Sequence, residues 1–258
     1  MALLAVEHLS FTYPSGAEPV LRDVSFTLEA GDFTVLLGAT GSGKSTLLRC
    51  VNQELSYTGV ITDGEKNLAF LSPKERARTV AILPQTMPVP HVTGWEQAAF
   101  GRNPYLDLTG RLREKDREAV RQALEDADAR ELEGRFVDTL SGGERQRINL
   151  AMILAQNTPI VLLDEPTAHM DQAHEAAFLR RLNQLKQRRK KTFLLILHDL
   201  TLAAAFADDL VVLDGGTIRF SGTKEECLRQ QIIENVFSVR RYAVQEKGKT
   251  RLFFSAAE

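Results

Sequence analysis

The hydrophobic pattern divides the chain into short apolar segments and longer amphipathic ones. Strong β-formers predict strands over 3–13, 20–28, 33–38, 79–85, 159–165 and 192–198. Apolar residues recurring on one face predict helices from Ser45 and over 113–129, 142–156, 173–189 and 199–207. In 173–189 the apolar stripe is Phe178, Leu182 and Leu185. Turn residues predict hairpins over 58–68, 209–222 and 240–255, the last one after a short helix.

Strands that alternate with helices predict an α/β fold. Its main sheet is expected to be largely parallel and covered on both faces, with an N-terminal antiparallel subdomain beside it. The pattern is helical from about 87 to 157, which indicates an inserted helical subdomain. We therefore expect one domain over 1–224, with a core of 1–86 and 158–224, followed by a tail over 225–258.

Composition narrows the class of protein. Of 258 residues, 43% are hydrophobic and 26% are charged, with a net charge of −2, which is typical of a soluble globular domain without a general affinity for nucleic acid. The basic run 186–191 is expected to be a solvated helix end. Cys50 and Cys227 have no disulfide or metal-site spacing. No stretch reaches the ~18–20 apolar residues of a membrane span, and the N-terminus lacks signal-peptide features.

The segment "GATGSGKS" predicts a site for nucleotide phosphates. It matches G-x-x-x-x-G-K-[ST] and lies between a predicted strand and a predicted helix, as this motif requires. Backbone N–H groups of the loop would surround the phosphates, Lys44 would reach the β- and γ-phosphates, and the Ser45 hydroxyl would bind Mg²⁺. The predicted nucleotide-binding residues here are Gly38, Ala39, Thr40, Gly41, Ser42, Gly43, Lys44, Ser45 and Thr46.

Two adjacent carboxylates follow a later apolar strand. In "IVLLDEP", Asp164 would hold Mg²⁺ and Glu165 would orient or deprotonate an attacking water. A kinase has no need of a carboxylate directed at water, so the pair indicates hydrolysis. Gln85 and His198 are placed at two further strand ends, and ligands of a parallel sheet gather at such ends. The predicted catalytic set is therefore Glu165 with Lys44, Gln85 and His198.

The order of the motifs resembles that of ATP-binding cassette (ABC) ATPases. "GATGSGKS", Gln85, "LSGGE", "VLLDEP", "HMD" and His198 follow one another over residues 1 to about 224. The resemblance implies ATP and Mg²⁺ as cofactors, with Ser45, Gln85 and Asp164 as metal ligands. Ala39 and Thr40 stand where proline and asparagine are commoner in the family, and Met170 stands where leucine is usual; both departures are expected to be harmless.

The resemblance also implies that two copies pair head to tail. Ser141, Gly142, Gly143 and Glu144 of one copy would bind the γ-phosphate held by the loop of the other, at a helix N-terminus. Asp171 matches the segment that links the two sites. Tyr13 matches the aromatic residue that stacks on adenine, with an ordinary strand tyrosine as the alternative and Phe11 as the fallback.

Two details resemble importers of iron-siderophores, haem and vitamin B12. These are "GRNPY" at 101–105 and "PTAHMD" at 166–171. The likeness implies integral permease subunits as partners, a substrate-binding protein acting indirectly, no nucleic acid, and a peripheral position on the cytoplasmic face of the membrane. Trp95 and Phe100 are expected to be helix core, with permease contact as the alternative. An exporter ATPase, or a soluble cassette acting on ribosomes or DNA, remains open.

Overall fold

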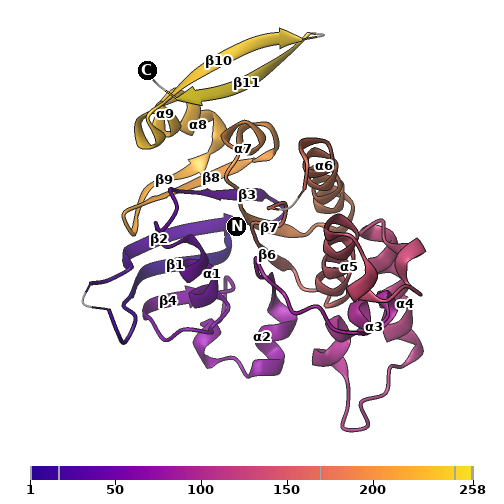
Figure 1. Cartoon of the computed structure of the whole chain (residues 1–258). Helices are drawn as coiled ribbons and strands as arrows, with labels where there is room; N and C mark the ends of the chain where they lie inside the picture. Colours follow the sequence, from indigo (N-terminus) through magenta and orange to yellow (C-terminus); the bar gives the residue numbers. More distant parts are fainter. Residues whose placement is uncertain (1, 17, 169, 247, 257–258) are drawn as a thin grey trace. The chain divides into compact units, whose positions relative to one another are not determined.

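The computed structural model describes residues 2–16, 18–168, 170–246 and 248–256. The chain forms two compact units, Met1–Phe70 with Thr192–Glu258 and Leu71–Lys191 (Figure 1). The predicted subdomain limits at 87 and 157 remain a prediction. His169, part of the "HMD" motif, and the last two residues of the predicted tail lie outside the described residues.

The first unit contains a mostly parallel sheet in the order β7-β3-β8-β9. Its strands are β3 (Phe33–Leu37), β7 (Thr192–Ile196), β8 (Asp209–Asp214) and β9 (Thr217–Thr223). β3 pairs in parallel with β7 and β8, so that Val35 lies opposite both Leu195 and Leu210. Every residue of β3 and β7 is buried, which explains why each strand is apolar apart from one threonine, Thr34 in β3 and Thr192 in β7. Helices α1 (Lys44–Val51) and α7 (Leu200–Phe206) follow β3 and β7.

An antiparallel sheet in the order β2-β1-β4 completes the N-terminal part of this unit. Its strands are β1 (Ala2–Phe11), β2 (Leu21–Glu29) and β4 (Thr58–Thr62). The hairpin predicted over 58–68 is wrong, because β4 pairs with β1 and only a single bridge, Thr62 to Asn67, closes the turn. The 3-10 helix η1 (Leu68–Phe70) replaces the second strand and buries Leu68 completely.

The tail of this unit contains two helices and a hairpin. α8 (Lys224–Arg229) and α9 (Ile232–Phe237) replace the single short helix predicted, and they are separated at Gln231, whose φ is 54°. The predicted terminal hairpin is confirmed by β10 (Val239–Glu246) and β11 (Lys249–Ala256), which pair in antiparallel register. In Figure 1 this yellow hairpin lies beyond α8 and α9.

The second unit is mainly helical. It contains the parallel strands β5 (Val80–Leu83) and β6 (Ile160–Asp164). Its helices are α2 (Pro73–Thr79), α3 (Gly94–Ala99), α4 (Glu114–Asp126), α5 (Gly142–Ala155) and α6 (Gln172–Arg189), with 3-10 helices η2 (Phe100–Tyr105), η3 (Arg130–Leu132) and η4 (Val137–Thr139). The sequence pattern missed α2 because the helix buries no residue. Its start is nevertheless encoded by the capping box of Ser72 and Glu75.

The long helices bury the faces that the sequence indicated. Phe178, Leu182 and Leu185 of α6 are buried. The basic end of α6 is solvated as predicted except for Lys191, which is buried, and its Nζ donates to the Thr158 carbonyl at 2.6 Å. Burial lowers the pKa of Lys191 to about 8. Within the described part of the chain, every helix is too short or too polar to cross a bilayer.

Candidate functional site

The predicted site residues divide between the two units. The phosphate loop, Tyr13 and His198 belong to the first unit, and Gln85, Asp164, Glu165, the 141–144 segment and Asp171 belong to the second. The loop connects β3 to α1, as the motif requires. A Cβ at Gly38 would lie 2.4 Å from the Leu213 carbonyl oxygen and 2.5 Å from Ser42 Oγ, so only glycine can occupy this position.

The phosphate loop has the properties of an anion site. Lys44 is 5% exposed, and its Nζ donates to the carbonyl oxygens of Gly38 at 2.9 Å and Ala39 at 3.0 Å. No side chain caps the N-terminus of α1. Ser42 Oγ is buried without a hydrogen-bond partner among the described residues. Uncapped N–H groups, a cation and an unsatisfied hydroxyl together fit a phosphate group.

Tyr13 lies beside this loop, just beyond the end of β1. Its hydroxyl is 3.2 Å from Thr46 Oγ1 in α1, and its ring meets that of Phe11 edge-on at a centroid distance of 4.7 Å. Phe11 is buried, whereas Tyr13 is partly exposed. Of the two aromatic candidates, Tyr13 is therefore the one that presents a ring to a ligand.

His198 is exposed and lies two residues beyond β7, where the sequence placed it at the strand end. Asp199, the next residue, caps α7 by accepting from the Leu202 N–H at 2.9 Å. His198 lines a cavity of about 290 Å³ together with Val239 of β10 and Phe254 of β11. No motif in the tail indicated that it borders a predicted catalytic histidine.

The second unit brings Gln85 and Glu165 into direct contact. β5 ends two residues before Gln85, and β6 ends at Asp164, which is 7% exposed. The Gln85 side-chain amide donates from Nε2 to Glu165 Oε2 at 2.7 Å. Glu165 has a φ of 47°, a backbone conformation that residues other than glycine rarely adopt. Such residues are concentrated at functional sites.

The segment "LSGGE" forms the start of α5. Ser141 is the N-cap; its hydroxyl accepts from the Glu144 N–H at 3.3 Å, and Glu144 accepts from the Ser141 N–H at 2.9 Å. The bond from the Ser141 N–H to the carboxylate, followed by the Ser141 hydroxyl and by Arg135, which donates at 2.6 Å, lowers the pKa of Glu144 to about 2. Glu144 is therefore ionised at neutral pH and serves the capping box.

Among the residues that the structure describes, no contact accounts for the two glycines of this segment. Gly142 and Gly143 have ordinary helical backbone angles, and a Cβ built on either meets no atom within 4 Å. Helix interiors and first turns accept alanine more readily than glycine. Small residues on an open, positively polarised helix end are what the close approach of an outside anion requires.

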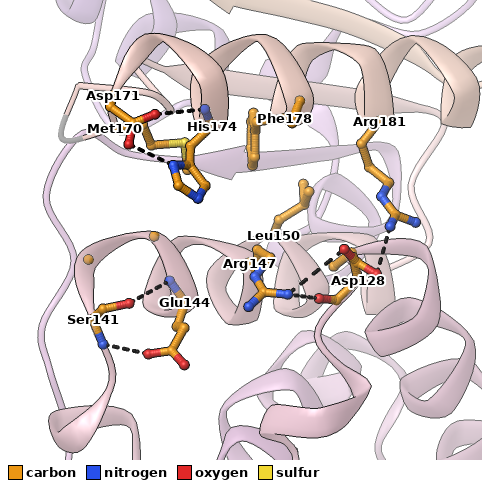
Figure 2. Close-up of a pocket in the computed structure, with 14 residues that line it drawn as sticks. Asp128, Ser141, Glu144, Arg147, Leu150, Met170, Asp171, His174, Phe178 and Arg181 are labelled. Carbon is orange, nitrogen blue, oxygen red and sulfur yellow. Dashed lines mark hydrogen bonds and ion pairs between the residues drawn. The ribbon is translucent and has the colours of Figure 1, made fainter.

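This helix end opens into a cavity of about 600 Å³ between α5 and α6 (Figure 2). Across the cavity, Asp171 caps α6 by accepting from the His174 N–H at 2.9 Å, and it contacts the His174 ring Nδ1 at 2.8 Å. The backbone bond and then the ring hold the pKa of Asp171 below its usual value. Figure 2 shows His174 projecting from α6 toward the first turn of α5.

Each unit, taken by itself, offers oxygen atoms of the kind that Mg²⁺ accepts as ligands. Among the described residues there is no group of three or more His, Cys, Asp and Glu side chains that could hold a metal on its own. Mg²⁺ is commonly bound through one carboxylate, hydroxyl oxygens, water and substrate phosphates. In the second unit Asp164 offers a carboxylate and Gln85 an amide oxygen, and in the first unit Ser45 offers a hydroxyl.

The expected core position of Phe100 is wrong. Its side chain is 45% exposed, and Trp95 is partly exposed. Both line a groove of about 230 Å³ with Leu106 and Leu112. The expectation failed because α3 is anchored through Gln97 and Ala98, which are 3% and 0% exposed.

A phosphate loop, a strand ending in Asp-Glu and a second glycine-containing helix start define a nucleoside-triphosphatase of the phosphate-loop class. The family described as ABC transporter matches residues 21–168, more than half of the chain. The chain therefore belongs to the ABC transporter family and is an ATP-hydrolysing cassette that binds ATP.

Several relatives match over most of their length. The iron(3+)-hydroxamate import ATP-binding protein FhuC of Bacillus subtilis is 36% identical over 93% of this chain and 89% of its own. The ferric enterobactin transport ATP-binding protein FepC of Escherichia coli is 37% identical over 93% and 89%. The hemin import ATP-binding protein HmuV of Nocardia farcinica is 41% identical over 86% and 76%.

A solved structure with the same fold covers the whole chain. It belongs to a protein described as a metal-chelate type ABC transporter in an inward-facing conformation, with a TM-score of 0.86 over 100% of this chain and 98% of that one. At 24% identity this likeness concerns the fold alone. The expected α/β cassette fold is confirmed.

Proposed function

We propose that this cassette powers the import of a metal chelate through a membrane permease. The observation that carries the proposal is the set of curated relatives. Proteins named for the transport of ferric hydroxamate, ferric enterobactin and hemin are 36%, 37% and 41% identical to this chain. The chelate itself stays open, because a cassette acts on ATP and not on the transported molecule.

In this proposal the residues of the phosphate loop hold the ATP phosphates. Lys44 exchanges its present carbonyl partners for phosphate oxygens, and Tyr13 stacks on the base. Ser45, Asp164 and the Gln85 carbonyl oxygen would hold Mg²⁺, which would neutralise charge on the phosphates. Glu165 accepts a proton from, or orients, the water that attacks the γ-phosphate, and His198 contacts the same phosphate.

A second copy of the chain completes each site. Ser141, Gly142 and Gly143 of one copy approach the phosphate held by the loop of the other, and Asp171 lies at the contact between the copies. The open space around Gly142 supports this arrangement, since no described residue of the chain lies within 4 Å of a side chain built at this position.

Gly142→Asp tests the second copy. The residue meets nothing within the chain and an acid suits a helix N-terminus, so we expect an unchanged melting temperature but loss of ATP-driven dimerisation. Gly134→Asp is a matched control, since its added side chain also meets open space and lies outside the predicted site. Dimerisation of Gly142→Asp at the parent affinity would contradict the proposal.

The groove beside Trp95 and Phe100 is the proposed contact for the permease, and we call it the docking groove. It presents exposed aromatic and aliphatic surface on the segment that follows Gln85. Phe100→Ser should reduce co-purification with the permease while leaving ATP-driven dimerisation of the isolated protein intact. Tyr242→Ser, on the terminal hairpin and 50% exposed, is the control for loss of an exposed aromatic.

One experiment tests the function as a whole. The chain is isolated from membranes of its own organism, its integral partners are identified, and the complex is reconstituted in vesicles for uptake of labelled ferric siderophores, hemin and cobalamin. We expect ATP-dependent movement of one of these chelates from the side of an external binding protein to the side of the cassette. The binding protein should stimulate this movement. Export of substrate from the side of the cassette, or co-purification with ribosomes or DNA alone, would overturn the proposal.

A further inference from the structure

The segment "GRNPY", residues 101–105, lies between an exposed groove and a buried helix contact. It lies on η2, between α3 and α4, and Phe100, with which η2 begins, is exposed in the groove described above. Gly101 and Arg102, the next two residues, are buried on the opposite side. The groove and the buried side of η2 are therefore separated by a single turn of backbone.

Gly101 makes a backbone contact with the last turn of α5. A Cβ at this position would lie 2.0 Å from the Met152 carbonyl oxygen and 3.0 Å from the Gln156 nitrogen. Only glycine permits this approach. Because no side chain lies between the two backbones, a displacement of η2 is passed to the end of α5 without being absorbed by rotamer changes.

Arg102 fixes the same end of α5 through its guanidinium. It is 6% exposed, its Nη1 donates to the Ala155 carbonyl at 2.7 Å, and its Nε and Nη2 donate to Asp116 Oδ1 at 3.2 and 2.9 Å. Asp116 is 1% exposed, and its other oxygen accepts from the Arg113 N–H at 3.1 Å. One guanidinium thus joins the end of α5 to the start of α4.

Tyr105 extends the network toward the strand that precedes Gln85. Arg102 Cζ lies 3.9 Å from the centre of its ring, and Arg78 of α2 lies 4.8 Å from it and donates to the Pro104 carbonyl at 2.9 Å. From the end of α5, Gln156 Nε2 donates to the Val80 carbonyl at 3.2 Å, at the start of β5. η2, α5 and β5 are therefore linked through named polar contacts.

A buried ion pair is weak evidence for a stabilising role. Replacing such a pair with apolar residues of similar size is often neutral or stabilising, because the desolvation cost of the charges disappears. This pair joins the last turn of α5, whose first turn carries the predicted phosphate contact, to the first turn of α4, and this placement suggests a positioning role instead.

We propose that Arg102 is a positioning residue that couples the docking groove to the phosphate-binding start of α5. The proposal rests on the function proposed above. α5 has 14 residues and is a continuous rod of about 21 Å, so a shift at Ala155 moves Ser141 and the two glycines with it. Binding of the permease in the docking groove thereby determines the position of the start of α5, which contacts the phosphate held by the other copy.

The test uses variants built in a Glu165→Gln parent, which retains bound ATP. Arg102→Met with Asp116→Leu removes the buried charges as a pair and keeps the volume, so folding is expected to persist. Arg113→Met with Asp107→Leu is the matched control, since this pair makes a 2.7 Å ion pair but is exposed. Urea unfolding, binding of a fluorescent ATP analogue to the monomer, and ATP-driven dimerisation by sedimentation are measured for each.

The double variant at 102 and 116 should keep the parent's stability and its monomer nucleotide affinity within twofold, yet weaken dimerisation at least tenfold. Arg102→Lys keeps the charge but loses the forked guanidinium and its contact with the Tyr105 ring. Its dimerisation affinity should lie between those of the parent and the double variant. Dimerisation at the parent affinity, or a parallel loss of monomer nucleotide binding, would overturn the coupling role. Failure of the parent itself to dimerise with ATP would instead count against the proposed function.

Discussion

The side-chain amide of Gln85 donates a hydrogen bond to Glu165 at 2.7 Å. The two residues are 80 positions apart in the sequence, and each follows one of two adjacent parallel strands, β5 and β6. Glu165 is held in a left-handed backbone conformation while it makes this contact. The proposed base is therefore oriented by the first residues of the segment that leads into the docking groove.

Removing the Gln85 amide should slow turnover more than it weakens binding. We expect Gln85→Ala to lower kcat by about tenfold or more, because a base that is no longer oriented loses part of its advantage, while the KM for ATP rises less, since Ser45 and Asp164 remain to hold Mg²⁺. Steady-state kinetics measure both. Gln184→Ala, an exposed glutamine on α6, is the control. An unchanged kcat in Gln85→Ala would show that the contact has no part in turnover.

Replacing the proposed base should separate binding from hydrolysis. Glu165→Gln is expected to bind ATP and form a stable dimer, while its turnover falls by about 100-fold or more, in line with the loss of a general base. Dimerisation is measured by sedimentation with ATP and turnover by phosphate release. Glu118→Gln, an exposed residue of α4, serves as the control. Normal turnover in the Glu165 variant would remove this residue from the mechanism.

Lys44 should carry much of the nucleotide affinity of the single chain. In the wild type, ATP at about 100 times its Kd should raise stability by about 2.7 kcal/mol and the melting temperature by several degrees. Lys44→Ala should lose most of this rise, because the substitution removes the one buried cation among the described residues of the phosphate loop. Lys66→Ala, an exposed lysine in the same unit, should behave as the wild type. A full ligand-induced rise in the Lys44 variant would contradict the assignment.

The partly buried position of Asp209 leads to a prediction that replacing its carboxyl group stabilises the protein at neutral pH but not at acidic pH. Burial, followed by the charges of Asp32 and Asp208, raises its pKa to about 6 from 3.8. A carboxyl whose pKa is higher in the folded state favours folding below pH 4 and opposes it once both states are ionised above pH 6. Asp209→Asn should therefore stabilise the protein by roughly 1–2 kcal/mol at pH 7.5, a value reduced for partial solvation from about 1.4 kcal/mol per pKa unit.

Urea unfolding at pH 7.5 and pH 4 measures this difference. The gain from Asp209→Asn should shrink toward zero at the lower pH, where the wild-type carboxyl is neutral in the folded state. An equal gain at both pH values would mean that the charge of Asp209 is not its origin.

The sequence predicted most of the framework because short apolar strands and capped helices leave local signals. The apolar face over 142–156, which forms α5, and the apolar run that ends at Asp164 are examples. Features that depend on distant contacts were not predictable. Phe100 has a core-like position in the helical pattern and is exposed, because α3 is anchored by Gln97 and Ala98 instead.

The candidate site was predictable as a set of residue types but not as contacts. The motifs named Gln85 and Glu165, yet their hydrogen bond depends on the pairing of β5 with β6. Likewise, the position of Val239 and Phe254 beside His198 follows from the packing of the terminal hairpin, for which the tail carries no motif.

The central claim is that each ATP is held jointly by two copies of the chain. The direct measurement is the ATPase rate per chain as the wild-type protein is diluted through the range in which sedimentation detects the dimer-to-monomer transition. The account predicts that the rate per chain falls in parallel with the dimer fraction and vanishes for the monomer. A constant rate per chain down to concentrations at which only monomers are present would contradict it.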